Sequence, residues 1–462
     1  MLPTIATGNV GSALAGEYEV ANSLRYNGSD VADALTKSIS STSSVTKSTY
    51  SAWVKRSELG RNQHINYVES GGRYSEIYFN TSDQILIFHY HSATTQAHLV
   101  TSRVFRDVSA WYHIVVAFDS TQGTASNRIK LYVNGVQETS FGTETYPSSS
   151  ADLAFNTSGQ THNIGNANLS ASLSLDGYLT EVCWIDGQQL DPTSFGEFDE
   201  DSGIWKPIDV SGLTFGTNGF YLDFENSGSL GADVSGNGNN FTVNNLTSVD
   251  QSTDTCTNNF ATLNPLDTTR GLSDGNLTYS GASGGTVVKG TIAINSGKFY
   301  AECKILNASE NMIGVLDITV SPSIAYLGYS SLGWGIYTGD GNLYNNNSAS
   351  SYSNSFSNND IMGIALDMDN NKLYFSKNGT WQNSGNPESG ATGTGAISIT
   401  SGSTITFAGG REHSGDTASF NFGSPPYAVS SGNADGDGYG NFEYSVPSGY
   451  YALNTKNLAE YG

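Results

Sequence analysis

The amino-acid sequence predicts an all-β protein made of two tandem β-sandwiches. Two segments far apart in the chain, residues 111–136 and 360–381, each contain two strands with alternating apolar side chains, and the second strand of each runs into Asn-Gly. Asn-Gly readily adopts the positive φ angles of a tight hairpin turn. No long stretch has apolar residues at helical spacing. Because the two segments lie so far apart, we assign each to its own sandwich.

Composition and charge narrow the classes of partner. The chain has 462 residues, 53 of them glycine, and a net charge of −23. Such a length suits two or three domains. A strongly negative field repels nucleic acid and anionic membrane surfaces, so neither is expected as a partner. Three cysteines give no disulfide framework. No stretch approaches the ~20 apolar residues of a membrane span, so no membrane insertion is expected.

The strand signals divide the chain into five segments. Residues 1–20 are small and polar without any period and predict an N-terminal arm. Residues 21–253 carry the first sandwich and residues 272–428 the second. The intervening residues 254–271 contain many Thr and Asn together with one Pro, which is typical of a linker. Residues 429–462 form a C-terminal extension.

Each sandwich resembles a known family. The runs "YSAWVKR", "WYHIVVAFD", "IKLYVNG" and "DGYLTEVCWIDGQQLDPTSFG" follow one another in the order seen in the laminin-G-like branch of the concanavalin-A-like lectin/glucanase sandwiches. This resemblance implies a two-sheet jelly roll with a curved concave face. The later runs "GKFYAECKIL", "MIGVL", "GWGIYTGDGNLYNNN" and "DIMGIALDMDNNKLYFSKNG" resemble the SPRY sandwich.

The tandem of the two domains, together with the ending "GYYALNTKNLAEYG", resembles tail-fibre and other virion-surface proteins of tailed, notably marine, bacteriophages. The resemblance implies a viral structural protein, a fibre or spike adhesin that binds a host-surface glycan during host attachment. It also implies a homotrimer that resides on the virion. The three sparse cysteines suggest free thiols and folding in the reducing host cytoplasm. The N-terminal arm is too short and polar to fold alone, so we expect it to dock on another virion protein. A capsid decoration or cement protein is the alternative within the same class.

A secreted glycan-active hydrolase is the alternative of another class, because the first family includes glucanases. Those enzymes place their carboxylates in a Glu-x-Asp-x-x-Glu run on one strand. The nearest run here supplies Glu197 and Asp199, but Ser202 stands where the acid/base is needed. We therefore predict no catalytic residues and a protein that is not an enzyme.

Carbohydrate binding needs aromatic platforms beside polar donors, because a pyranose has an apolar face and a polar rim. Trp53 shares a strand face with Ser51 and Lys55, opposite the apolar residues of its strand. Trp184 likewise lies opposite Cys183 in its strand, so both rings are predicted to lie on the solvent-facing side of a sheet. Other candidates lie in loop-like surroundings. The full set of glycan-binding candidates is Trp53, Trp184, Trp205, Trp334, Tyr337 and Trp381. Ordinary packing in the core or at a subunit interface is the competing interpretation.

No cofactor is required, and calcium is the one candidate ion. Asn433, Asp435 and Asp437, followed by the carbonyl of Tyr439, match the front half of an EF-hand-like loop, although its twelfth position lacks the closing glutamate. A plain turn is the alternative. Asp233 is the second candidate, in a run that resembles a loop common in laminin-G-like domains. There the side chain either orders the turn or holds a cation.

Overall fold

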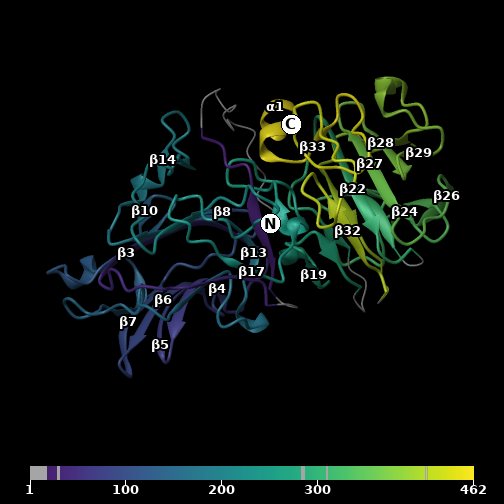
Figure 1. The fold of residues 1–462 in the computed structure, drawn as a ribbon. Coiled ribbons are helices and arrows are strands. Elements are labelled where there is room, and N and C mark those ends of the chain that lie inside the picture. The colour runs from purple at the N-terminus through teal and green to yellow at the C-terminus, as the bar shows by residue number, and fades with distance from the viewer. Residues whose placement is uncertain (1–17, 29–31, 282–286, 309–310, 412, 414) are drawn as a thin grey trace. The chain divides into compact units, whose positions relative to one another are not determined.

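The computed structural model describes residues 18–28, 32–281, 287–308, 311–411, 413 and 415–462 (Figure 1). The predicted N-terminal arm, residues 1–20, lies almost wholly outside this described part. The all-β prediction is confirmed, because 40% of the chain is strand and 6% is helix. The chain divides into two compact units, one that ends at Thr257 and one that spans Asn258–Gly462. Each unit is described by itself.

The first unit is a sandwich of two eight-stranded antiparallel sheets. One sheet has the order β10 (Val136–Gln137), β9 (Ile129–Val133), β8 (Trp111–Asp119), β3 (Lys47–Arg56), β13 (Asp176–Asp186), β1 (Ser23–Asn27) and β18 (Gln251–Ser252), with β16 (Phe220–Leu222) also paired to β13. The other has the order β11 (Phe141–Thr145), β7 (Thr94–Thr101), β6 (Ile85–His91), β5 (Arg73–Phe79), β4 (Gln63–Ser70), β12 (Thr161–Ile164), β2 (Ala34–Ser38) and β17 (Thr242–Asn244).

Short elements complete the first unit. A separate hairpin pairs β14 (Gly196–Phe198) with β15 (Trp205–Pro207). Four 3₁₀ turns connect the strands, namely η1 (Ala125–Asn127), η2 (Ala171–Leu173), η3 (Pro192–Ser194) and η4 (Ser248–Asp250).

The first unit has two layers of buried side chains. Between its sheets lies a core that includes Ile77, Ile87, Leu131 and Trp184. Strand β13 is buried on both of its faces, because a second cluster that includes Cys183 packs on its other side. The connections that follow β13 supply the residues that cover this side.

The second unit is also a sandwich. Its larger sheet has the order β19 (Leu272–Ser273), β20 (Thr278–Tyr279), β32 (Ala418–Asn421), β22 (Lys298–Ile305), β27 (Ile361–Asp367), β28 (Lys372–Lys377) and β29 (Thr380–Trp381), with β30 (Ile397–Ser398) paired to β28 and β33 (Tyr451–Ala452) to β22. The smaller has the order β21 (Val288–Lys289), β31 (Ile405–Gly409), β23 (Met312–Asp317), β24 (Gly333–Tyr337), β25 (Asn342–Asn345) and β26 (Ser348–Ser351). The remaining elements are η5 (Pro265–Asp267), η6 (Pro387–Thr392) and the helix α1 (Thr455–Tyr461).

Both Asn-Gly turns form as the sequence predicts. Asn134 and Gly135 have φ angles of 49° and 76°, and Asn378 and Gly379 have φ angles of 48° and 77°. The first pair joins β9 to β10 and the second joins β28 to β29, each as a two-residue loop. The left-handed conformation of both central residues is what a type I′ hairpin requires.

The segments between and after the sandwiches are packed rather than free. Asp254 is 1% exposed and belongs to the first unit, whereas Phe260 and Leu263 are buried in the second. In the C-terminal segment, the backbone N–H groups of Glu443 and Tyr444 donate to the buried carboxylate of Glu302 at 2.9 and 2.8 Å. Residues 429–462 are therefore part of the second unit.

Candidate functional site

One face of the sheet β11–β17 in the first unit carries a transverse row of aromatic and polar side chains. Strand register pairs Tyr67 with Glu76, Glu76 with Phe88, and Phe88 with His98. In the other direction Tyr67 pairs with Asn163. Directly paired residues point to the same side of a sheet. The row therefore lies on one face, and the alternate residues of the same strands, such as Ile77 and Ile87, fill the core.

The rings on this face contact one another. Tyr74 stacks on Tyr90 with centroids 5.1 Å apart and on Phe88 at 5.8 Å. The ring of His64 stacks on Tyr78 at 4.4 Å. We call this surface the aromatic face and define it as His64, Tyr67, Tyr74, Glu76, Tyr78, Phe88, Tyr90 and His98. All of these except His64 and Tyr67 are partly exposed.

Polar groups on the aromatic face are held in fixed positions. His64 Nε2 lies 2.8 Å from the carboxylate of Glu76, and Asn168 Nδ2 donates to the Tyr67 hydroxyl at 3.1 Å. Burial raises the pKa of Tyr67 and of Tyr78 to about 12, so both phenols remain neutral at physiological pH. The face thus combines flat apolar rings, neutral hydroxyl groups and one oriented carboxylate, which are the groups that contact a pyranose.

Neither Trp53 nor Trp184 lies on a solvent-facing sheet as predicted: Trp53 does point away from the apolar set of its strand, but that face is covered, whereas Trp184 points into the core. Trp53 is 4% exposed and packs with Trp111, Tyr178 and Trp205. Trp184 is fully buried in the core, where its indole N–H donates to Asn156 at 3.0 Å. For Trp184 the cause is a bulge in β13 between Thr180 and Cys183, which shifts the alternation by one residue. For Trp53 the cause is the cover supplied by Trp111, Tyr178 and Trp205.

Trp205 and Trp334 are also buried, so neither presents a face to a sugar. Trp205 lies on β15, not in a loop; its indole N–H donates to His113 at 2.9 Å, and its ring covers Gly135. Trp334 lies on β24 and points into the core of the second unit with 3% exposure. A large ring in an alternating strand is most easily accommodated on the buried side.

The last two aromatic candidates remain partly exposed. Trp381 lies on β29 and packs edge-on against Tyr300 and Tyr374, with centroids 6.5 Å apart in both pairs. Tyr337 ends β24 on the side opposite Trp334 and lines a pocket of the second unit. Tyr337 is thus the predicted aromatic residue that this pocket brings into a candidate site.

The calcium candidates are engaged in turns. Asp435 accepts backbone N–H groups from Asp437 at 3.0 Å and Tyr439 at 2.9 Å, and its second oxygen accepts from Ala452 and Asn457. Among the described residues, no group of three His, Cys, Asp or Glu side chains is arranged to hold a metal ion. The loop around Asn433 therefore has the hydrogen bonds of a plain turn.

Asp233 also orders a turn. Its carboxylate accepts backbone N–H groups from Tyr221 at 3.0 Å, Ser235 at 2.9 Å and Asn239 at 2.7 Å. These bonds fix the run 233–241 against β16.

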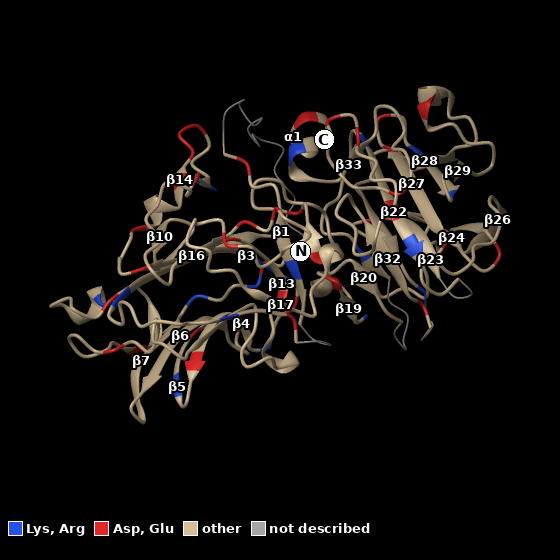
Figure 2. Cartoon of the chain, viewed as in Figure 1, with Lys and Arg blue, Asp and Glu red and all other residues tan. Residues whose placement is uncertain are grey.

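The acidic run considered for hydrolysis lies on the β14–β15 hairpin, whose turn carries several carboxylates (Figure 2). Asp199 accepts the Ser202 backbone N–H and hydroxyl, each at 2.8 Å. Hydrogen bonds lower the pKa of Asp199 to about 2. The largest effect comes from the Ser202 backbone N–H, and smaller ones come from the Ser202 hydroxyl and Lys206. An ionised carboxylate that caps a turn is unsuited to act as a general acid.

The sequence interpretation missed the aromatic face. Tyr74, Glu76 and Tyr78 alternate with Ile77 and Phe79, so both faces of β5 are apolar by composition. Hydrophobicity alone does not tell which face is buried. The signal is the charged residue, because Glu76 in the middle of the strand marks the side that stays accessible.

Comparison with known families agrees with the two sandwiches. Residues 28–188 match the concanavalin A-like lectin/glucanases superfamily, and residues 298–410 match the SPRY domain. The chain thus contains a laminin-G-like, concanavalin A-like domain followed by a SPRY domain. The aromatic face belongs to the first of these and the Tyr337 pocket to the second.

Several solved structures resemble parts of the chain. The human HERC1 SPRY domain is 18% identical, with a TM-score of 0.28, and the match covers 34% of this chain and 96% of that one. The SAP-like pentraxin of Limulus polyphemus is 13% identical with a TM-score of 0.29, covering 37% and 79%. The TRIM65 PSpry domain is 15% identical with a TM-score of 0.28, covering 35% and 91%. No curated protein matches the chain. None of the helices in the described residues is long and apolar enough to cross a membrane.

Proposed function

We propose that this protein is a non-enzymatic adhesin that binds a host-surface glycan through the aromatic face of its concanavalin A-like domain. The observation that carries the proposal is the stacked pair Tyr74 and Tyr90 beside the oriented carboxylate of Glu76. Stacked rings offer an apolar platform to the C–H face of a sugar, while a carboxylate accepts hydrogen bonds from its hydroxyl groups. Lectin-like and SPRY sandwiches are consistent with such a recognition role.

A glycan array probed with the full chain tests the proposal. Binding to at least one neutral glycan is expected, and Tyr90→Ala is expected to weaken it about 5-fold, because a stacked aromatic contact is worth about 1 kcal/mol. Tyr329→Ala is the matched control, since Tyr329 is 49% exposed on the second unit and outside the aromatic face. Equal loss in both variants, or binding untouched by Tyr90→Ala, contradicts the proposal.

The location of the protein is part of the same proposal. The order of the two domains and the ending of the chain resemble virion-surface proteins of tailed bacteriophages, which supports a fibre or spike that folds in the host cytoplasm and is carried as a homotrimer on the virion. Residues 1–20 would dock on another virion protein. Several copies on one particle would raise the avidity of a weak contact by about 100-fold or more.

Two alternative functions, a capsid decoration protein and a glycan hydrolase, predict different results in assays of the same purified protein. A capsid decoration protein would bind purified capsids and would not bind the glycans of the array. A hydrolase would release new reducing ends from host polysaccharide. We expect no new reducing ends, since the one carboxylate run considered for catalysis is tied into the β14–β15 turn.

A further inference from the structure

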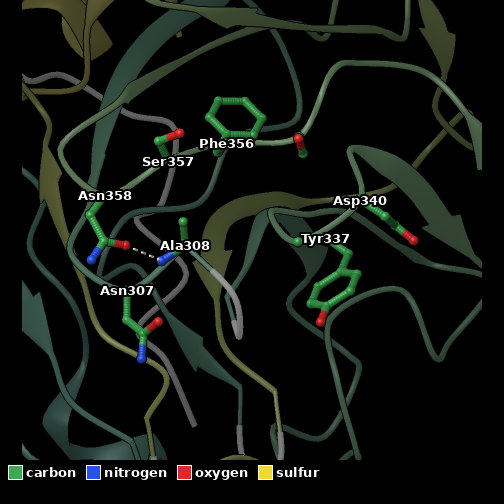
Figure 3. A pocket seen from close by; sticks show the side chains of 9 residues that line it. Asn307, Ala308, Tyr337, Asp340, Phe356, Ser357 and Asn358 are labelled. Atoms are coloured by element: carbon green, nitrogen blue, oxygen red, sulfur yellow. Dashed lines mark hydrogen bonds between the residues drawn. The ribbon is translucent and has the colours of Figure 1, made fainter.

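The second unit contains a pocket of about 660 Å³ that is separate from the aromatic face. Three connections form it: β22–β23 with Asn307 and Ala308, β24–β25 with Asp340, and β26–β27 with residues 355–358. Figure 3 shows Phe356, Ser357 and Asn358 on one side and Tyr337 with Asp340 on another. Its volume lies within the range of about 300–1,000 Å³ that is typical of ligand pockets.

The β26–β27 connection is tied down by its backbone. The N–H of Phe356 donates to the carbonyl of Thr338 at 2.8 Å, and the N–H of Ser357 donates to Asp360 at 2.7 Å. Lys377 Nζ donates to the carbonyl of Ser355 at 2.6 Å. A loop anchored at successive residues loses little conformational entropy when a ligand binds.

The side chains of the same connection keep free hydrogen-bonding groups. Asn358 Oδ1 accepts the N–H of Ala308 at 2.8 Å, which leaves the amide NH₂ as a donor. The hydroxyl groups of Ser355 and Ser357 are exposed and make no hydrogen bond to any described residue. Two hydroxyls and one amide therefore face solvent on a fixed backbone.

An apolar wall stands across from these groups. Tyr337 lines the pocket, and the Arg411 guanidinium carbon lies 4.9 Å from the centre of its ring. Gly339 packs against the same ring, because a Cβ at this position would lie 2.8 Å from Tyr337 Cζ. Phe356, 6% exposed, adds a second ring to the lining. The position of Tyr337 is thus set from two sides.

We propose that this pocket is a second saccharide-binding site, which takes one neutral pyranose unit. Hydroxyl and amide groups on one side match the polar rim of such a sugar, and the part of the Tyr337 ring left open between Arg411 and Gly339 offers an apolar contact to its C–H groups. Among the described lining residues Asp340 is the one that carries a charge, and the guanidinium of Arg411 behind Tyr337 carries the opposite charge, so a neutral sugar is the best match.

The site would make each chain bivalent for carbohydrate. Two weak sites on one chain bind a repeating polysaccharide more tightly than either alone when both can be engaged at once. The pocket proposal does not depend on the aromatic face, since the two sites lie in separate units and use different residues.

The experiment uses the full chain with ¹³C-labelled alanine methyl groups, because the Ala308 methyl lies in the pocket. The probes are methyl α-D-glucopyranoside, methyl β-D-galactopyranoside, methyl α-D-mannopyranoside and N-acetyl-D-glucosamine. At least one should shift the Ala308 signal saturably with a dissociation constant of about 1–10 mM, as a single shallow site allows. The Ala308 signal is assigned by its loss in Ala308→Ser.

Ser355→Ala/Ser357→Ala should weaken this binding at least about 5-fold, because two hydrogen bonds are removed. The matched control is Ser348→Ala/Ser350→Ala, two exposed serines of β26 outside the pocket. Gly339→Ala should weaken binding as well, since it displaces Tyr337. Both serine pairs lie on the surface, so the variants are expected to fold, which alanine-methyl dispersion checks.

Two results would overturn the proposal. One is the absence of any Ala308 shift with all four probes at about 100 mM, far above the expected dissociation constant. The other is a shift whose dissociation constant is unchanged in Ser355→Ala/Ser357→Ala. If that shift disappears in Tyr90→Ala, the sugar binds on the aromatic face instead. A shift that weakens in Ser355→Ala/Ser357→Ala and persists in Tyr90→Ala supports the pocket, even where the glycan array fails.

Discussion

The hydroxyl of Tyr221 donates a 2.8 Å hydrogen bond to the carboxylate of Glu181, which lies at the bulge of β13 with a φ of 53°. Tyr18 donates to the same carboxylate oxygen at 2.9 Å. Because Glu181 is the extra residue of the bulge, its side chain does not follow the in–out alternation of β13. The residue is 6% exposed, and its carboxyl group lies beside the hydroxyl groups of Tyr221 and Tyr18. A buried carboxyl group at a strained position is a point where protonation and stability are coupled.

We predict that the free energy of unfolding falls as the pH rises from 4.5 to 7. Burial raises the pKa of Glu181 from 4.5 to about 7, the hydroxyls of Tyr221 and Tyr18 oppose this shift, and Asp223 and Glu225 add to it. In that window the folded state holds a proton that the unfolded state has lost, so each step upward in pH favours unfolding. The full loss attributable to this group is about 3 kcal/mol.

Urea unfolding of the wild type and Glu181→Gln at several pH values checks this prediction. Glutamine keeps the shape of the side chain without its charge, so the variant should lack this part of the pH dependence and should be at least as stable as the wild type at pH 8. An unchanged slope between pH 4.5 and 7 in Glu181→Gln would refute the assignment to this residue.

The two Asn-Gly hairpins could be predicted because their conformation is decided within four residues. At Asn134 and Gly135 the backbone itself demands positive φ, and no distant contact is needed to know that a turn forms there. The alternation of apolar residues in β8 and β27 is equally local. The number of sandwiches follows from such signals, whereas the order of strands within each sheet depends on pairings between distant segments.

The position of Trp184 could not be predicted, because it depends on one extra residue in β13. Alternation counted through an undetected bulge assigns the wrong face to every residue beyond it. In addition, a cluster contributed by later connections covers the other face of β13, so Cys183 and Trp184 are both buried. The aromatic face was missed for the related reason that β5 is apolar on both sides.

We expect Gly135→Ala to destabilise the first unit by about 3 kcal/mol. Its φ is 76°, and an added Cβ would lie 2.3 Å from a ring carbon of Trp205. The ring is held by its hydrogen bond to His113, so it cannot move aside without breaking that contact. The cost combines backbone strain with overpacking, each worth one to a few kcal/mol.

Gly60→Ala separates the two contributions. Gly60 has the same φ of 76°, yet an added Cβ meets nothing within 4 Å. Its destabilisation should be about 1 kcal/mol, the strain alone. Chemical denaturation of both variants is the measurement, and equal losses would show that the Trp205 ring contributes nothing to the effect.

Removal of divalent cations is expected to leave the melting temperature unchanged. All four hydrogen bonds to the Asp435 carboxylate come from groups of the protein, so no metal is needed to satisfy its oxygens.

Asp435→Asn should destabilise the second unit by about 2 kcal/mol, because an amide cannot accept hydrogen bonds at both positions. The exposed Asp201→Asn serves as the control. A melting temperature that rises with added calcium would contradict the prediction.

The last prediction concerns Glu76. Its carboxylate lies on the aromatic face, 16% exposed and 2.8 Å from His64 Nε2. A charged acceptor forms stronger hydrogen bonds with sugar hydroxyls than a neutral amide does, so Glu76→Gln should lower glycan affinity by about 10-fold. The paired control is Glu138→Gln, since Glu138 is bonded to Arg103 and lies outside the aromatic face. Titration of both variants with the best glycan of the array, alongside an assay for reducing ends, measures the effect.

Equal affinity in Glu76→Gln and Glu138→Gln would remove Glu76 from the binding site. Reducing ends that appear with the wild type and vanish in Glu76→Gln would instead identify it as a catalytic carboxylate and replace the adhesin by a hydrolase.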